Sequence, residues 1–186
     1  MERTIFPPRL TTGEFTILTN DPSIRAWGWV VINGKGRILE KGCIKTETAG
    51  KKRRIRKGDE DVHRTEEIVE ELLRVIKKYN IQYILSELPH GSQNASAAKM
   101  IGICVGIIVG ISKPLDIGVE WYSEGDSKKA AYGRVSGDKQ EMIDAMSAKY
   151  NVEWTGIKYI DEAVADALGV HNAAMKESGT LKLMKR

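Results

Sequence analysis

Two acidic residues stand where apolar strands of the predicted sheet end. Asp21 follows "TILTN" and is itself followed by Pro22, while Glu87 closes "YILSE" and is followed two residues later by Pro89. Proline ends a strand because it has no N–H for the hydrogen-bond ladder. In mixed sheets, functional side chains gather at strand ends where neighbouring connections diverge. We therefore expect Asp21 and Glu87 to face one cleft.

A further source of carboxylates is the segment "YIDEAVADALG" near the C-terminus. In a helix, Glu162 and Asp166 are four residues apart and share a face, and the alanines around them allow the helix to lie close to a sheet. Asp161 points about 140° away from Asp166 at roughly 100° per residue. Glu162 and Asp166 are therefore the candidates to join the strand-end acids.

Carboxylates that converge in a cleft repel one another unless cations neutralise them. Oxygen-only ligands suit Mg²⁺, with Mn²⁺ able to substitute for it. Two such ions roughly 3.5–4 Å apart activate a water and stabilise the leaving oxygen in phosphodiester hydrolysis. Each acid also has a plain structural explanation, as a turn former before proline or as a helix-terminal or solvated acid. Only their combination favours a metal site.

The elements that must position these acids follow from hydrophobic periodicity. An antiparallel meander is expected over 15–20, 27–32 and 37–45, with "NGKG" as the hairpin between its last two strands. Alternating helices and strands follow, with helices at 62–80, 94–112, 125–133, 137–149 and 160–176 and strands at 81–88 and 117–123. This order predicts an α/β fold: a mixed five-stranded sheet, three antiparallel strands then parallel ones, with helices on both faces and strands one and four as central neighbours.

Length and composition indicate one domain. The chain has 186 residues, of which 41% are hydrophobic. We expect an irregular N-terminal arm at 1–14, the domain at 15–178 and a basic tail at 179–186. Two cysteines far apart argue against a zinc site. The most apolar run, 100–111, is shorter than the roughly 20 residues of a membrane span and predicts a buried helix. A soluble cytoplasmic protein without a membrane partner is therefore expected, in a bacterial cell or a phage-infected host cell.

The charge pattern permits an acidic partner. The formal net charge is +4, and one run, "KKRRIRK", concentrates cations that would neutralise phosphates. A solvated loop is the alternative explanation of such a run. The residues expected to bind DNA here are Lys51, Lys52, Arg53, Arg54, Arg56 and Lys57.

Four segments together resemble one known family. "NDPSIRAWGWVVI", "LSELPHGSQNASAAKMIGICVGI", "DSKKAAYGRVSGDKQEM" and "DEAVADALGVHNAA" are similar, in order and spacing, to the motifs of RuvC-type Holliday-junction resolvases. These are dimeric nucleases of the ribonuclease-H superfamily. The resemblance runs over about 16–176. It implies a ribonuclease-H-like sheet, a homodimer, and metal-dependent resolution of four-way DNA junctions by paired symmetric nicks.

The resemblance also assigns residues. Asp21, Glu87 and Asp166 match the family's catalytic, metal-binding acids. The family has a further acid three residues before the last aspartate, where this chain has Ala163. We expect Glu162 to take that role, and Asp161 is the alternative less favoured by helical geometry.

Other positions match DNA-contacting and dimer-forming parts of the family. Lys128 and Lys139 match basic positions near the scissile phosphate or backbone, and His90 stands where many resolvases carry an aromatic that opens the junction centre. Gly102, Gly106 and Gly110 recur every four residues along the apolar helix. This spacing indicates close helix packing, either inside the domain or in a homodimer.

Two other functions compete with junction resolution. A ribonuclease-H-fold nuclease acting on other branched DNA or on hybrids would use the same acids, since fold alone does not determine substrate. A non-catalytic junction-binding protein would explain the missing acid at Ala163. The retained acids argue against it, because negative charge beside phosphates does not help binding.

Overall fold

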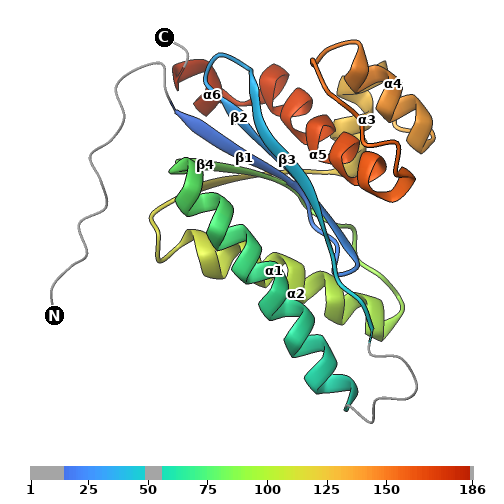
Figure 1. The fold of residues 1–186 in the computed structure, drawn as a ribbon. Helices are drawn as coiled ribbons and strands as arrows, with labels where there is room; N and C mark the ends of the chain where they lie inside the picture. Colours follow the sequence, from blue (N-terminus) through green and yellow to red (C-terminus); the bar gives the residue numbers. More distant parts are fainter. Residues whose placement is uncertain (1–14, 49–55, 185–186) are drawn as a thin grey trace, which may run out of the picture.

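The computed structural model describes residues 15–48 and 56–184, which form one mixed sheet between two helical layers (Figure 1). The strands are β1 (Thr16–Asp21), β2 (Ala26–Asn33), β3 (Ile38–Lys45), β4 (Tyr83–Glu87) and β5 (Gly118–Tyr122). Their order is β3-β2-β1-β4-β5. β2 is antiparallel to β1 and β3, whereas β4 is parallel to β1 and β5. The predicted sheet and its central β1–β4 pair are confirmed. The expected arm at 1–14 lies outside the described residues.

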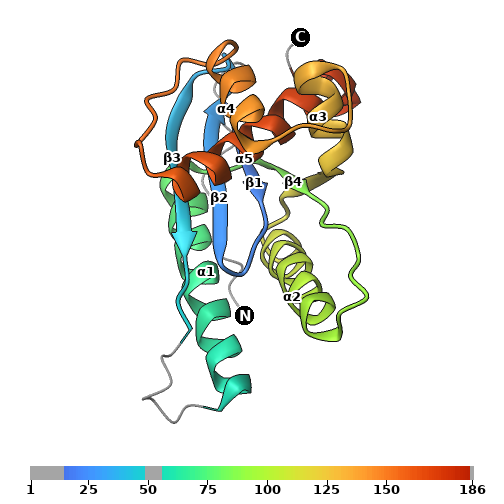
Figure 2. The same cartoon turned by 90° about the vertical axis from the view of Figure 1, so that its right-hand side faces the viewer.

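Six helices flank the sheet in the described part of the chain. They are α1 (Lys57–Tyr79), α2 (Ala95–Ser112), α3 (Glu124–Tyr132), α4 (Lys139–Ser147), α5 (Lys158–Glu177) and α6 (Gly179–Met184). α1 and α2 cover one face, and α5 covers the other with α3 and α4 outside it (Figures 1 and 2). The predicted helices on both faces are therefore present.

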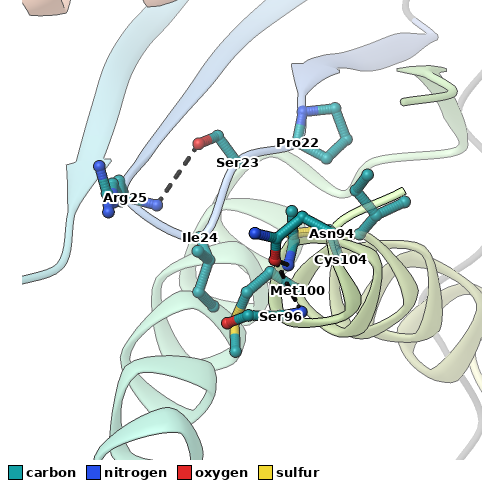
Figure 3. A pocket seen from close by; sticks show the side chains of 10 residues that line it. Pro22, Ser23, Ile24, Arg25, Asn94, Ser96, Met100 and Cys104 are labelled. Carbon is teal, nitrogen blue, oxygen red and sulfur yellow. Dashed lines mark hydrogen bonds between the residues drawn. The ribbon is translucent and has the colours of Figure 1, made fainter. Parts of the chain in front are cut away.

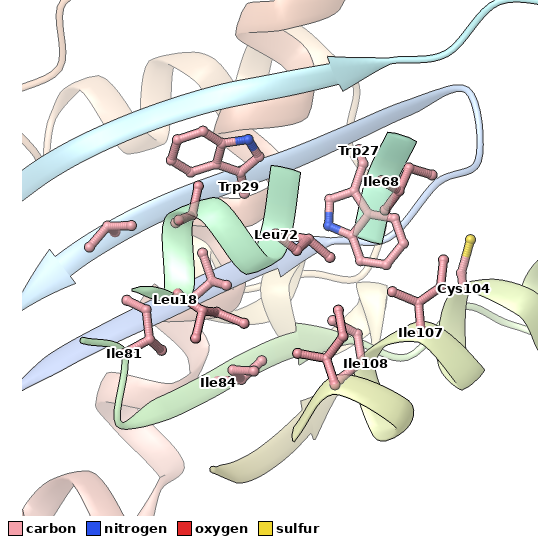
Figure 4. Packing of buried hydrophobic residues seen from close by; sticks show 14 of the residues in the cluster. Leu18, Trp27, Trp29, Ile68, Leu72, Ile81, Ile84, Cys104, Ile107 and Ile108 are labelled. Atoms are coloured by element: carbon pink, nitrogen blue, oxygen red, sulfur yellow. The ribbon is translucent and has the colours of Figure 1, made fainter. Parts of the chain in front are cut away.

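The face beneath α1 and α2 holds the larger apolar core (Figure 4). The buried residues Leu18, Trp27 and Ile84 of the sheet pack there with Leu72 of α1 and Ile108 of α2. The Trp27 indole Nε1 donates to Asn20 Oδ1 at 3.1 Å, so the residue before Asp21 is fixed within this core. Apolar burial on this scale rigidifies the strand end that carries the acid.

On the opposite face α5 lies unusually close to the sheet. An ideal Cβ on Gly28 would stand 2.0 Å from the carbonyl oxygen of Ala163. The Thr19 hydroxyl on β1 donates to the Ala167 carbonyl at 2.6 Å. Glycine on the strand and alanines on the helix allow this approach. It brings the acidic turn of α5 to the end of β1.

α2 differs from the buried helix that its composition predicts. Cys104, Ile107, Ile108 and Ile111 are buried on one side. Only 28% of the helix is buried, and Val109 is 42% exposed. Among the described residues, α2 is the one helix whose length and composition would allow it to cross a membrane. Its apolar residues are instead divided between the core and an open face.

The segment expected as a basic C-terminal tail is folded in large part. Residues 179–184 form α6, and Leu181 is buried. The Glu120 carboxylate on β5 accepts hydrogen bonds from the hydroxyls of Tyr122 at 2.7 Å, Tyr83 at 2.9 Å and Ser178 at 2.9 Å. These contacts join the end of α5 to the sheet, so the folded unit extends beyond residue 178.

We predict that Gly28→Ala lowers the free energy of unfolding by about 3 kcal/mol, because the added methyl group meets the Ala163 backbone rather than a flexible side chain. Thermal or urea unfolding measures the loss. The control is Gly58→Ala in α1, where a Cβ meets nothing within 4 Å. Equal stability of the two variants would contradict the tight β2–α5 contact.

Candidate active site

The parallel pairing of β1 and β4 brings Asp21 and Glu87 to one edge of the sheet. Asn20 pairs with Ser86, and the two acids are the next residues on these neighbouring strands. Both are half-buried. The expectation that strand ends place the two carboxylates together agrees with this register.

Asp166 of α5 is the third acid near this edge, and it forms an ion pair with a lysine, Lys139. The side chain of Asp166 is 13% exposed. Lys139, the first residue of α4, forms a short ion pair from Nζ to Asp166 Oδ2. We call Asp21, Glu87 and Asp166 the acidic site. Its members come from two strands and one helix. Lys139 pairs with Asp166, and its charge also acts on Asp21 and Glu87.

Burial and mutual repulsion raise the pKa values across the acidic site. Burial raises the pKa of Asp21 to about 7, with repulsion from Asp166 adding to the effect and Lys139 opposing it. Burial raises the pKa of Glu87 to about 8, and the charges of Asp21 and Asp166 contribute. Burial also raises the pKa of Asp166, against the opposing effect of Lys139. The acidic site therefore favours additional positive charge.

The donor chemistry of the acidic site fits hard divalent cations. Carboxylate oxygens are the ligands that Mg²⁺ and Mn²⁺ prefer, and the site contains no sulfur or imidazole donor. Over residues 15–48 and 56–184, no three acidic, histidine or cysteine side chains are already arranged around one point. In the metal-free protein, the Lys139 ammonium pairs with Asp166.

The candidates for a fourth acid occupy different surroundings. Ala163 is 5% exposed and faces Gly28. Glu162 lies 3.9 Å from the Lys158 ammonium, and its charge raises the pKa of Asp166. Asp161 is buried and accepts three hydrogen bonds of 2.8 Å, from the Thr155 N–H, the Thr155 hydroxyl and the Gly156 N–H. Asp161 thus fixes the turn before α5 and is not part of the acidic site.

Sequence reasoning missed Glu124, the first residue of α3. Tyr122, at the end of β5, pairs with Glu87 on β4, so Glu124 follows at the same edge of the sheet. Its charge contributes to the raised pKa values of Asp21, Glu87 and Asp166. The strand-end rule that selected Asp21 and Glu87 points to Glu124 when it is applied to strand five.

Of the predicted DNA-binding residues, Lys128, Lys139 and His90 lie near this edge. Lys128 of α3 forms an ion pair of 2.5 Å with Glu124. His90 is exposed between β4 and α2, and its charge helps to lower the pKa of Glu124. Arg56 is exposed immediately before α1, which begins at Lys57. The predicted contacts Lys51, Lys52, Arg53 and Arg54 lie outside the described residues.

A cavity of about 540 Å³ adjoins the turn that follows Asp21 (Figure 3). Pro22, Ser23 and Arg25 line it from the turn, and Asn94 and Met100 line it from the start of α2. The Asn94 side chain caps α2 by accepting from the N–H groups of the second and third helical residues, at 2.9 and 3.1 Å. The concave surface beside Asp21 thus has polar groups at its rim.

We predict that stability without metal falls as pH rises from about 5 to 8. The pKa values near 7 and 8 lie above the ordinary 3.8 and 4.5, so the folded chain binds more protons than the unfolded chain in this range. Glu87→Gln removes part of this dependence and raises Tm by several degrees at pH 8 but little at pH 5. Thermal scans in EDTA measure both. Parallel pH profiles for the two proteins would refute the raised pKa of Glu87.

Comparison with known proteins identifies the family. The family model for crossover junction endodeoxyribonuclease RuvC matches residues 17–172. A protein of that description from Methylococcus capsulatus is 26% identical over 178 residues, covering 91% of this chain and 96% of the relative. Thermus thermophilus RuvC in complex with a Holliday junction superposes with a TM-score of 0.70 at 18% identity, covering 87% of this chain and 93% of the other. The yeast mitochondrial Holliday junction resolvase gives 0.61 at 10% identity, covering 96% and 84%. The family match spans β1 through Asp166, and this chain belongs to the crossover junction endodeoxyribonuclease RuvC family.

Proposed function

We propose that the protein is a metal-dependent, structure-selective endodeoxyribonuclease that resolves four-way DNA junctions by paired symmetric nicks. The observation that carries this proposal is the acidic site, which unites carboxylates from β1, β4 and α5 around the Lys139 ammonium. Family membership supplies the substrate class. Half-buried carboxylates at a sheet edge would supply the means of holding divalent cations.

In this proposal Asp21, Glu87 and Asp166 hold Mg²⁺, which Mn²⁺ can replace, and Glu162 stands beside them on α5. Bound ions of this kind lower the pKa of a water and stabilise the leaving oxygen of a phosphodiester. The protein's part is to orient the carboxylates. Because the pKa values of Asp21 and Glu87 are raised, these groups would have to release protons when an ion binds. If Asp166 held such an ion, the Lys139 ammonium, which pairs with Asp166 in the metal-free protein, would be available to a phosphate oxygen.

The proposed DNA surface combines cations near the acidic site with the basic run at 51–57 of the sequence. The net charge of +4 and the cations near this edge favour a polyanion. We assign phosphate contacts to the basic segment 51–57 and to Lys128 and Lys139. His90, exposed between β4 and α2, is assigned to the junction centre.

We also propose that the protein works as a homodimer in the cytoplasm, with α2 at the interface. Gly102, Gly106, Val109 and Gly110 form the exposed apolar side of α2. An exposed apolar surface of this kind marks an interaction site, and glycines let a second backbone approach closely. A two-fold dimer presents two acidic sites to symmetry-related strands, which paired nicking requires.

Two other functions remain distinguishable by experiment. A nuclease of this fold acting on other branched DNA or on hybrids would cut those substrates in preference to a four-way junction. A junction-binding protein without catalysis would have no use for the acidic site, whose charge repels phosphates. The raised pKa values therefore favour the enzyme.

We predict that Asp21→Asn lowers nicking of a labelled four-way junction by more than about a hundredfold in Mg²⁺, because it removes a charged oxygen ligand from the acidic site. Nicking by the unaltered protein should be paired, abolished by EDTA, and weak on linear duplex. The matched control is Asp116→Asn, an exposed position in the turn before β5. Binding without nicking in every divalent metal would exclude the nuclease, and preferred cutting of flaps or hybrids would change its substrate.

We predict that Gly106→Arg converts a dimer to a folded monomer. A Cβ at Gly106 meets nothing within 4 Å inside the protomer, so the long charged side chain disturbs only a neighbour on α2. Light scattering coupled to size exclusion gives the mass. Gly58→Arg, equally open within the protomer but on α1, serves as control. A monomeric unaltered protein, or a dimeric Gly106→Arg variant, would remove α2 as the interface.

A further inference from the structure

The chain has no acid at position 163. Ala163 is 5% exposed and lies against Gly28 of β2, where an added Cβ would stand 2.0 Å from the Ala163 carbonyl oxygen. If a fourth carboxylate serves the acidic site, it must come from another residue.

Glu124 follows β5 at the edge of the sheet that carries the acidic site. β5 runs parallel to β4, and the Leu88 N–H donates to the Tyr122 carbonyl at 2.7 Å, so the chains stay paired up to this edge. The Ser123 hydroxyl accepts from the Asp126 N–H at 3.1 Å and fixes the first turn of α3. Glu124 is the first residue of that turn. Its position is therefore set by the sheet and a helix cap.

Glu124 and Glu162 differ in how many acids of the acidic site their charges affect. The charge of Glu124 contributes to the raised pKa of all three members of the acidic site, whereas that of Glu162 is among the main contributions only at Asp166. Lys139, the cation of the site, also helps to lower the pKa of Glu124. Glu124 is thus attracted by the same lysine as the acidic site, and it repels the carboxylates of that site.

We infer that Glu124, at the β5–α3 junction, is a metal-site carboxylate of this protein and compensates for the alanine at position 163. The inference rests on the proposed function. It adds to the proposed metal site a residue from the connection between β5 and α3. Lys128, 2.5 Å from Glu124, neutralises it until an ion is bound. Glu124 is then a partner of Lys128 in the metal-free protein and of the acidic site in the loaded one.

A purely local role for Glu124 makes a different prediction. An acid at a helix N-terminus paired with a lysine four residues later stabilises the helix by a few tenths of a kcal/mol. In that case Glu124→Gln and Lys128→Met would cause similar small losses of Tm, and neither would alter metal binding. A metal-site carboxylate instead predicts that only Glu124→Gln weakens metal binding, because that substitution removes a ligand whereas Lys128→Met removes a competing cation.

The test is Mn²⁺ binding to the full chain without DNA, measured at pH 8 from the electron paramagnetic resonance signal of free Mn²⁺. Glu124→Gln should weaken binding about tenfold, and Lys128→Met should leave it equal or stronger. Glu71→Gln on α1, which also removes an acid paired with a neighbouring basic residue, is the matched control. Glu162→Gln is measured in parallel.

The outcomes separate this inference from the proposed function. Unchanged Mn²⁺ affinity in Glu124→Gln, or a loss confined to Glu162→Gln, overturns the role of Glu124 while metal-dependent nicking by the unaltered protein still stands. Failure of the unaltered protein to bind Mn²⁺ and to nick junctions overturns both. Weakened binding in Glu124→Gln with binding retained in Lys128→Met and Glu71→Gln supports the inference.

Discussion

The contact between β2 and α5 is the constraint on which the acidic site depends. Gly28 and Ala163 allow backbone to approach backbone, and the Thr19 hydroxyl ties β1 to the Ala167 carbonyl one residue after Asp166. A helix held at the ordinary distance by larger side chains would carry Asp166 away from the strand ends. One packing requirement therefore positions Asp166 beside the strand-end acids.

In the acidic site, the burial that positions the carboxylates opposes their ionisation. Burial that fixes Asp21 and Glu87 also disfavours their ionised forms, so the metal-free protein keeps protons on them at pH values where free carboxyl groups have none. Lys139 relieves part of the repulsion through Asp166. In the proposed function, protons, the Lys139 ammonium and a divalent ion would compete for the same carboxylate oxygens.

The two faces of the sheet serve different purposes. The α1 and α2 side supplies the large apolar core that fixes Asn20 next to Asp21, while the α3–α5 side supplies Asp166, Lys139 and Glu124 (Figures 2 and 4). α2 belongs to the core on one side and leaves glycines open on the other. In the proposed homodimer, a second copy would cover this open side of α2.

The sequence by itself determined the strands, the helices, the mixed sheet and the pairing of Asp21 with Glu87, because hydrophobic periodicity and proline-terminated strands are local signals. It also indicated Asp166, since spacing on a helix is fixed by helical geometry. The family motifs located the missing acid at Ala163, but they gave no reason for it. Only the tertiary structure decided that α2 is half open, that residues 179–184 form a docked helix, and that Asp161 is engaged in a turn. Each of these depends on which elements pack together, and the distance between α5 and β2 is a property of two segments far apart in the chain.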